Sequence, residues 1–277
     1  MRKTLFALAL LGARGWGQTA SPAPVLERVV VVGASGSAGF GIEKNLADAL
    51  DATISAAHEP VRCIANTLFF VDVLGQGPMQ IERAREAKPT LLVAVDFLFW
   101  FGYGFSNAEE KPLASEEERL ALLEQGLALL EGFSCPVVVG DFPDCSRSIG
   151  KMLFESQVPE PATLAALNAR LAGWAESRRN VVILPLARSV ERLFAAGNAG
   201  TATDGSAALE IAGWAYPAGA AELLFQPDQL HPTLEGLALI AHLVARELVL
   251  RDLVEAEDVL LEREGVLEGL REVPAKR

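Results

Sequence analysis

The stretch "VVVVGASGSAGFG", residues 29–41, decides the fold of this chain. Its four valines predict a buried strand, because β-branched residues favour strands, and the small residues after them allow a sharp turn into a helix. Two kinds of site fit such a turn. Gly33, Gly36 and Gly39 have the G-x-x-G-x-x-G spacing of a dinucleotide-binding loop, whose backbone amides hold a pyrophosphate. Alternatively, Ser35 is a nucleophile and the glycines make room for it.

The pattern of a strand followed by a helix continues along the chain. Continuous apolar runs predict four further strands buried on both faces, at 61–66, within 90–101, at 136–141 and at 180–185. Apolar spacing, a Ser115–Glu118 capping box and Pro161 predict helices at 42–54, 119–130, 161–178 and 234–248. Because parallel strands need crossover connections, the sequence predicts an α/β fold with a three-layer, doubly wound, mostly parallel five-stranded sheet.

Composition limits the partners. The 277 residues are 51% hydrophobic, enough for one substantial core. With 36 acidic and 24 basic residues the net charge is −12, which repels a phosphate backbone and anionic membranes. We therefore expect no nucleic-acid partner, whereas neutral esters or sugars meet no such barrier.

The two ends of the chain differ from its middle. Residues 1–20 have a basic start, a short apolar stretch and small residues, a pattern typical of a secretory signal peptide. The stretch is too short for a permanent membrane anchor, so we expect export to the periplasm or the medium. One domain is predicted over 25–252, with an irregular Gly/Ala/Thr-rich segment at 197–219. Residues 253–277 are predicted to be a charged C-terminal helix or tail.

The cofactor hypothesis lacks the residues that usually accompany the glycines. A dinucleotide-binding unit places an acidic residue near the end of its second strand, but that strand ends in Asn66 here. Enzymes with this glycine spacing also use a Tyr and a Lys four residues later. Tyr103 is followed at that distance by Asn107, and Tyr216 by Ala220. Only the glycine spacing keeps an NAD(P)-binding enzyme as an alternative.

The nucleophile hypothesis gains partners near the C-terminus. In "FQPDQLHPT", residues 225–233, Asp228 stands three residues before His231. In a catalytic triad the carboxylate accepts the imidazole Nδ1 proton, and Nε2 takes the proton of the serine hydroxyl. Ser37 is a rival nucleophile on the same turn, and Ser35 is also a residue type that caps helices.

Together the two ends resemble the SGNH hydrolases, also called the GDSL esterase and lipase family. "GASGSAGFG" at 33–41 is similar to the family's first block, although Ala34 stands where Asp is common, and "DQLHPT" at 228–233 is similar to the last block. The resemblance implies a flavodoxin-like sheet and a triad of Ser35, Asp228 and His231. It implies no metal and no organic cofactor.

The family's oxyanion hole is only partly matched. It uses the backbone N–H of the nucleophile, a glycine after the second strand and an asparagine side chain after the third. The resemblance therefore assigns the Ser35 N–H and Gly75, with Gly77 as the alternative to Gly75. The asparagine has no counterpart in "VDFLFWFGYG", residues 95–104.

Asp96 follows the third strand, where the asparagine is expected. An ionised carboxylate cannot donate a hydrogen bond to an oxyanion. We expect Asp96 to bind backbone amides or to orient a neighbouring loop, and a backbone N–H from 97–104 to complete the hole. Asp96, Trp100 and Tyr103 are candidate pocket residues, because ligands of open α/β sheets lie beyond the carboxyl ends of the strands.

These observations predict a serine hydrolase that cleaves a small-molecule, carbohydrate or lipid ester through an acyl-enzyme. The alternative is a catalytically weak protein on the same scaffold that binds a carbohydrate or lipid with its aromatic strand end. The sequence leaves the acyl group, the alcohol and the oligomeric state open.

Overall fold

The computed structural model describes residues 24–104, 115–198, 209–217 and 219–274. The predicted signal peptide at 1–20 lies outside these ranges, and so do residues 199–208 and 218 of the segment predicted to be irregular, 197–219. The described part of that segment is not irregular, because residues 209–216 form an antiparallel hairpin.

A parallel five-stranded sheet forms the centre of the molecule. Its strands are β1 (Val29–Val31), β2 (Arg62–Cys63), β3 (Leu91–Ala94), β4 (Val137–Gly140) and β5 (Val181–Leu184). They pair in the order β2-β1-β3-β4-β5, and each pair is parallel. This is the doubly wound order in which the chain starts near the middle of the sheet and winds outward in both directions. The predicted α/β fold class is confirmed.

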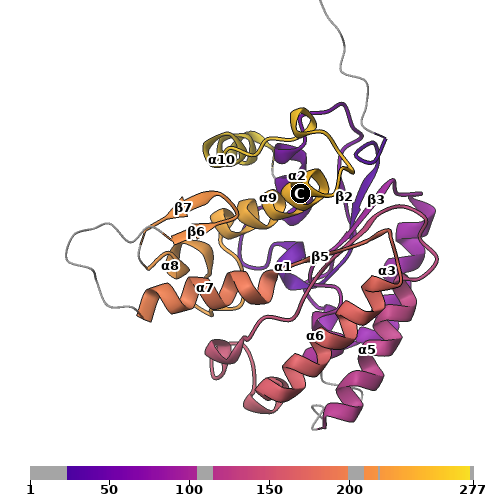
Figure 1. Ribbon diagram of the computed structural model, residues 1–277, viewed down its shortest axis with the longest axis vertical. Coiled ribbons are helices and arrows are strands. Elements are labelled where there is room, and N and C mark those ends of the chain that lie inside the picture. Colours follow the sequence, from indigo (N-terminus) through magenta and orange to yellow (C-terminus); the bar gives the residue numbers. More distant parts are fainter. Residues whose placement is uncertain (1–23, 105–114, 199–208, 218, 275–277) are drawn as a thin grey trace, which may run out of the picture.

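Helices cover both faces of the sheet, as Figure 1 shows. They are α1 (Ser35–Ala38), α2 (Leu46–Thr53), α3 (Val73–Glu86), α4 (Phe99–Tyr103), α5 (Glu116–Leu130), α6 (Pro161–Glu176), α7 (Leu186–Asn198), α8 (Ala221–Leu224), α9 (Leu234–Leu250) and α10 (Arg263–Glu272). One apolar core joins the sheet to α3, α5 and α6, and a second joins it to α2, α9 and α10. Successive valines of β1 alternate between the two cores, because side chains of a strand point to opposite faces.

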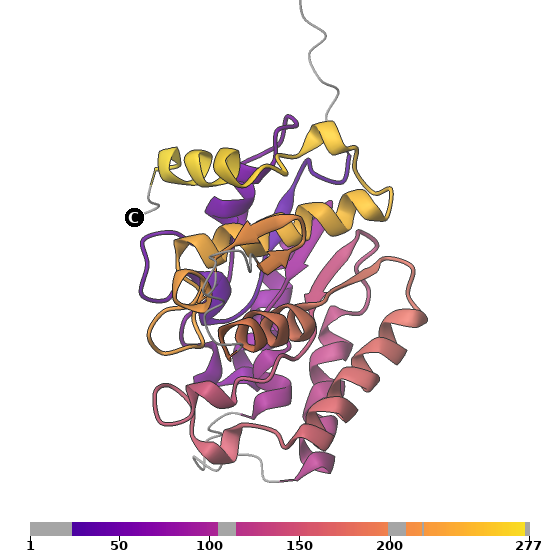
Figure 2. The same cartoon turned by 60° about the vertical axis from the view of Figure 1, so that its left-hand side comes forward.

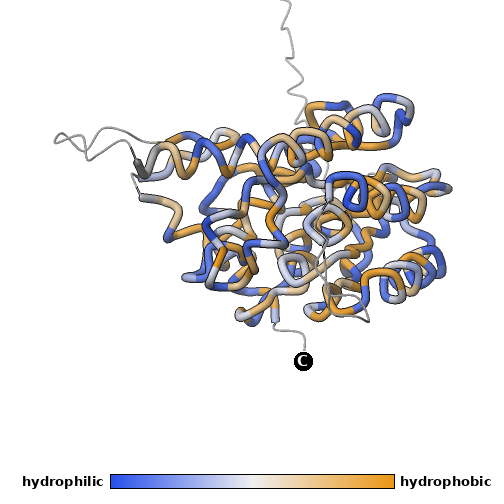
Figure 3. The backbone as a smooth tube through the Cα atoms, turned by 90° about the horizontal axis from the view of Figure 1, so that it is seen from below, coloured by the Kyte–Doolittle hydropathy of each residue, from blue (hydrophilic) through white to orange (hydrophobic). Residues whose placement is uncertain are grey.

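Local sequence explains where the helices begin. Ser115 and Glu118 form the predicted capping box of α5, and Pro161 occupies the first turn of α6. The helix predicted at 42–54 is shorter, because Asn45 caps it and Asp48 completes a capping box. In Figure 3 the helices are banded blue and orange along their length, as expected when only one side of each faces a core.

A small hairpin and a C-terminal helix complete the described fold. An antiparallel hairpin of β6 (Leu209–Ile211) and β7 (Trp214–Tyr216) contacts α7, and Figure 2 shows it in orange close to that helix. The C-terminal helix α10 packs on α2 and buries Val266, Leu267 and Leu270. None of the helices in the described part of the chain combines the length and apolar character of a membrane span.

Candidate active site

Three side chains from opposite ends of the chain meet at the end of β1. Ser35 begins α1, directly after the strand, and Asp228 and His231 lie on the loop between α8 and α9. His231 Nε2 lies 2.8 Å from Ser35 Oγ, and His231 Nδ1 lies 2.7 Å from Asp228 Oδ2. The imidazole is 3% exposed and the carboxylate 15%. With the proton on Nδ1, the ring donates to Asp228 and accepts from the Ser35 hydroxyl, the arrangement of a triad.

Backbone N–H groups of the same loop hold the Asp228 carboxylate in place. Asp228 Oδ1 accepts hydrogen bonds of 3.0 Å from the N–H groups of Leu230 and His231. Burial alone would raise the pKa of Asp228, but these N–H groups and the His231 ring together bring that pKa below its ordinary value. The carboxylate is therefore charged near neutral pH, as the partner of an imidazole must be.

Phe40 covers one face of the imidazole. Its ring stacks on the His231 ring with centroids 4.3 Å apart, and the Phe40 residue is 39% exposed. Gln226 fixes this contact, because its Nε2 donates both to Phe40 O at 2.6 Å and to Pro232 O at 2.9 Å. The turn after the nucleophile is thereby tied to the loop that carries His231.

Asp96, just after β3, clamps the turn of residues 33–39, which we call the nucleophile turn because it carries the candidate nucleophile Ser35. Its carboxylate accepts from the Ala34 N–H at 3.0 Å, the Ser37 N–H at 2.9 Å and the Ser37 hydroxyl at 2.5 Å. The expectation that Asp96 binds backbone amides is thus met in the structure. The hydroxyl of Ser37, the rival nucleophile, donates a hydrogen bond to Asp96, whereas the Ser35 hydroxyl is hydrogen-bonded to His231.

The glycines of the turn make room for this carboxylate. A Cβ on Gly33 would lie 2.1 Å from Asp96 Oδ1, and a Cβ on Gly36 would lie 2.9 Å from Asp96 Oδ2. In a dinucleotide site, amides of this turn would instead hold a pyrophosphate. Here two of these amides already bind the Asp96 carboxylate, whose negative charge would repel a pyrophosphate. The glycine spacing is therefore explained without a cofactor.

Gln80 is a second clamp, which sequence reasoning missed. From α3, its buried amide accepts from the Gly33 N–H at 2.8 Å and donates to the Gly33 carbonyl at 2.9 Å. The pair fixes the last residue before the turn. No local signal marks such a glutamine, because its role depends on how α3 packs against β1.

The structure does not bring Gly75 to the nucleophile. Gly75 lies in the first turn of α3, its N–H donates to Asp72 Oδ1 at 2.9 Å, and it is absent from the pocket around Ser35. The assignment of Gly75 to the oxyanion hole is therefore wrong for this structure. Gly77 packs against Leu129 and Phe101 and is no better placed. The sequence suggested Gly75 from its distance after β2, but α3 begins there and takes up its amide.

Other N–H groups stand closer to the reacting atoms. Among the described residues, the N–H groups of Ser35 and Gly36, at the start of α1, have no hydrogen-bond acceptor. Within 97–104, where a further donor was predicted, the N–H groups of Phe97, Phe99 and Phe101 bond to nearby carbonyls, so none of these three is that donor.

An apolar pocket opens beside Ser35 and His231, with a cavity volume of about 160 Å³. Asp96 and Trp100 line it, as expected. Tyr103 does not, and the prediction for this residue is wrong. Its ring is fully buried, and its hydroxyl donates to Pro143 O and accepts from the Cys145 N–H at 2.9 Å. The residue sits one helical turn further along α4 and packs into the core.

Asp141 also lines the pocket but is committed to the fold. Burial raises its pKa, and the N–H groups of Leu186 and Ala187 oppose that rise. The Ala187 N–H lies 2.7 Å from its Oδ1, so Asp141 holds the start of α7. Across the described ranges, no three His, Cys, Asp or Glu side chains gather as metal ligands would.

No protein-family model matches this sequence, and no curated protein does. Solved structures that the chain resembles include a protein from Bacteroides fragilis NCTC 9343 assigned as an acylhydrolase, with 19% identity, a TM-score of 0.48, and 86% of this chain and 93% of that one covered. TesA matches with 15% identity, a TM-score of 0.45 and coverage of 82% and 100%. A GDSL-like lipase from Bacteroides thetaiotaomicron VPI-5482 matches with 15% identity, a TM-score of 0.44 and coverage of 79% and 86%.

Proposed function

We propose that this protein is a serine hydrolase that cleaves carboxylic esters. The observation that carries the proposal is the continuous hydrogen-bonded line from Asp228 through His231 to Ser35, with contacts of 2.7 Å and 2.8 Å. A serine that only capped a helix would not need a hydrogen bond to an imidazole, and a purely structural histidine would not need one to a serine hydroxyl. The apolar pocket beside Ser35 supplies a place for an ester.

The chemistry has two halves. Ser35 Oγ forms a bond to the ester carbonyl carbon while its proton moves to His231 Nε2. As the tetrahedral intermediate collapses, the bond to the alcohol oxygen breaks and Nε2 gives that oxygen the proton. Water then attacks the acyl-enzyme and loses a proton to Nε2. Collapse breaks the bond to Ser35 Oγ, which recovers the proton, and the carboxylic acid leaves.

We assign the oxyanion to the N–H groups of Ser35 and Gly36. Both lie at the reacting end of α1 and have no acceptor among the described residues. Among the described residues that line the pocket there is no asparagine, and one such donor is worth about 10²–10³ in turnover. We therefore expect a slow esterase.

Active-site labelling tests the proposal. The purified protein is treated with a fluorophosphonate, and the modified residue is mapped by mass spectrometry. We expect label on Ser35, none in Ser35→Ala, and greatly slowed labelling in His231→Ala. Ser37→Ala is the matched control, because Ser37 lies on the same turn with its hydroxyl on Asp96, and it should still be labelled at Ser35.

Folded protein that takes no label at any pH would refute the proposal and favour the binding role. Label on Ser37 would refute the assigned nucleophile.

A further inference from the structure

The pocket beside Ser35 indicates which part of an ester the protein selects. Resting on the proposed function, we infer that this pocket takes the acyl chain of the substrate, and that the chain is aliphatic, uncharged and of medium length. The alcohol is then left on the solvent side and is weakly selected.

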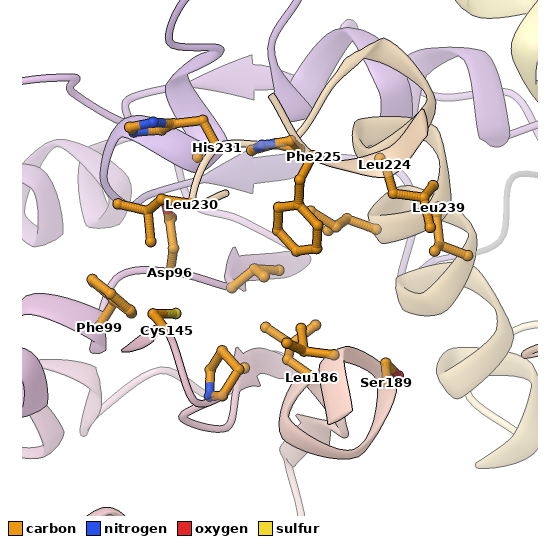
Figure 4. Close-up of a pocket in the computed structure, with 18 of the residues that line it drawn as sticks. Asp96, Phe99, Cys145, Leu186, Ser189, Leu224, Phe225, Leu230, His231 and Leu239 are labelled. Atoms are coloured by element: carbon orange, nitrogen blue, oxygen red, sulfur yellow. The ribbon is translucent and has the colours of Figure 1, made fainter. Parts of the chain in front are cut away.

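The position of His231 sets the direction of the bound ester. Its Nε2 must protonate the leaving oxygen, so the alcohol lies next to the imidazole and the acyl chain points away from it. Phe40 packs on the imidazole and is 39% exposed, so the end of the pocket next to His231 reaches the protein surface. In Figure 4, Asp96 and His231 lie at one end of the pocket, and Leu239 and Ser189 lie at the other. The acyl chain therefore runs from Ser35 toward Leu239.

The walls along that path are apolar and come from four separate elements. Leu186 belongs to α7, Ile211 to β6, Phe225 to the loop before His231 and Leu239 to α9. Figure 4 shows Leu186, Phe225 and Leu239 around the same space. Such walls make dispersion contacts with an aliphatic chain, but they supply few hydrogen-bond partners for the hydroxyl groups of a sugar.

The size of the pocket limits the chain. Because one water takes up about 30 Å³ in the liquid, a cavity of about 160 Å³ has room for several waters or several methylene groups. An acetyl group would leave most of this space unused. A palmitoyl chain would have to extend beyond it.

The charged groups at the pocket disfavour an anionic chain. Asp96, Asp141 and Asp144 line it, against one guanidinium, Arg147, which lies over the Phe194 ring with Cζ 4.4 Å from the centroid. A chain that ends in a carboxylate would meet this negative balance. A neutral chain would not.

Two measurements test the inference. The first compares kcat/KM for p-nitrophenyl acetate, butanoate, octanoate and palmitate. Each buried methylene should raise kcat/KM about fourfold, so we expect a rise of at least about 100-fold from acetate to octanoate and a fall toward palmitate. The second uses calorimetry on Ser35→Ala, which cannot cleave its ligand, and compares methyl octanoate with methyl acetate. Methyl octanoate should bind at least about 100-fold more tightly.

Substitutions at the far end locate the chain. Leu239→Trp should lower the octanoate-to-acetate ratio of kcat/KM at least about tenfold by filling the pocket, and Leu239→Ala should move the optimum toward longer chains. Leu250→Trp is the matched control. It lies on the same helix but is 59% exposed, whereas Leu239 is 7% exposed, and it should leave the ratio unchanged.

The outcomes separate the two proposals. Hydrolysis with the same kcat/KM for acetate and octanoate, or a ratio that Leu239→Trp leaves unchanged in folded protein, overturns the acyl pocket and leaves the esterase standing. Tight binding of methyl octanoate by Ser35→Ala, with no hydrolysis of any ester by the unmodified protein, supports the pocket and refutes the esterase.

Discussion

Asp96 holds the turn that carries Ser35. It accepts three hydrogen bonds from the nucleophile turn, two of them from backbone N–H groups. In Asp96→Asn, the amide nitrogen would face one of these donors and lose its bond. Because a bond to a charged group is worth about 1.5–3 kcal/mol, we expect the free energy of unfolding to fall by about 2–3 kcal/mol and kcat to fall with it.

Urea unfolding and ester hydrolysis would measure both effects. Asp72→Asn is the control, because Asp72 caps α3 with an exposed carboxylate away from Ser35. If Asp96→Asn and Asp72→Asn behaved alike, Asp96 would have no special part in holding the turn.

Asp228 links stability to pH. Its pKa is lowered in the folded protein, so it contributes stability above its unfolded pKa of about 3.9, and this contribution is lost as the pH falls through the lower folded value. Asp228→Asn should therefore be less stable than the unmodified protein at pH 7 and approach it in stability below about pH 4.

Activity should respond to the same substitution. An asparagine stabilises the imidazolium poorly and favours the wrong tautomer, so kcat should fall on the order of 10³–10⁴-fold. Urea unfolding at several pH values and steady-state kinetics would measure these effects. A stability difference that did not shrink in acid would show that the lowered pKa is not its source.

At the scale of elements, α3 holds the end of β1. The buried Gln80 amide accepts from the N–H of Gly33 and donates to its carbonyl, and Gly33 leads into the nucleophile turn. Gln80→Met keeps the volume but leaves the Gly33 N–H buried without this partner, which costs about 1–3 kcal/mol. We expect that loss of stability in thermal unfolding, together with a lower kcat. Gln76→Met, on the same helix with exposed hydrogen bonds, should cost less, and equal costs would contradict the clamp.

At the scale of the whole molecule, the C-terminal segment belongs to the core. Helix α10 buries Val266, Leu267 and Leu270 against the helices on one face of the sheet. Removing residues 262–277 exposes the surface they cover, and at about 1.5–3 kcal/mol for each buried side chain we expect a loss of about 5 kcal/mol. That is a large share of the stability of a typical domain.

Urea unfolding of the truncated chain would measure this loss. Glu268→Ala, on the exposed side of α10, should change the free energy of unfolding by less than about 0.5 kcal/mol. A truncated chain as stable as the full one would mean that α10 is peripheral.

The sequence by itself determined the sheet and the pairing of Asp228 with His231, because both follow from local patterns. Runs such as 29–32 and 136–139 are long enough to predict buried strands, and the alternation with helices leaves a parallel order. Asp228 and His231 are three residues apart, so their pairing needs only one loop, and the strand–turn after β1 presents Ser35. Helices α3 and α7 and the hairpin β6–β7 were missed, although α7 has a clear helical periodicity of apolar residues.

Only the tertiary structure determines which groups contact each other across long separations in the sequence. The bonds of Asp96 to the nucleophile turn and of Gln80 to Gly33 join residues 47 to 62 positions apart and depend on how elements pack. The same packing turned Gly75 into a helix-capping partner and placed Tyr103 in the core. It also built the pocket from α7, β6 and α9, which no stretch of sequence contains. A triad's reactive ends can be recognised from short motifs, but the shape of the space beside them exists only once distant side chains are packed together.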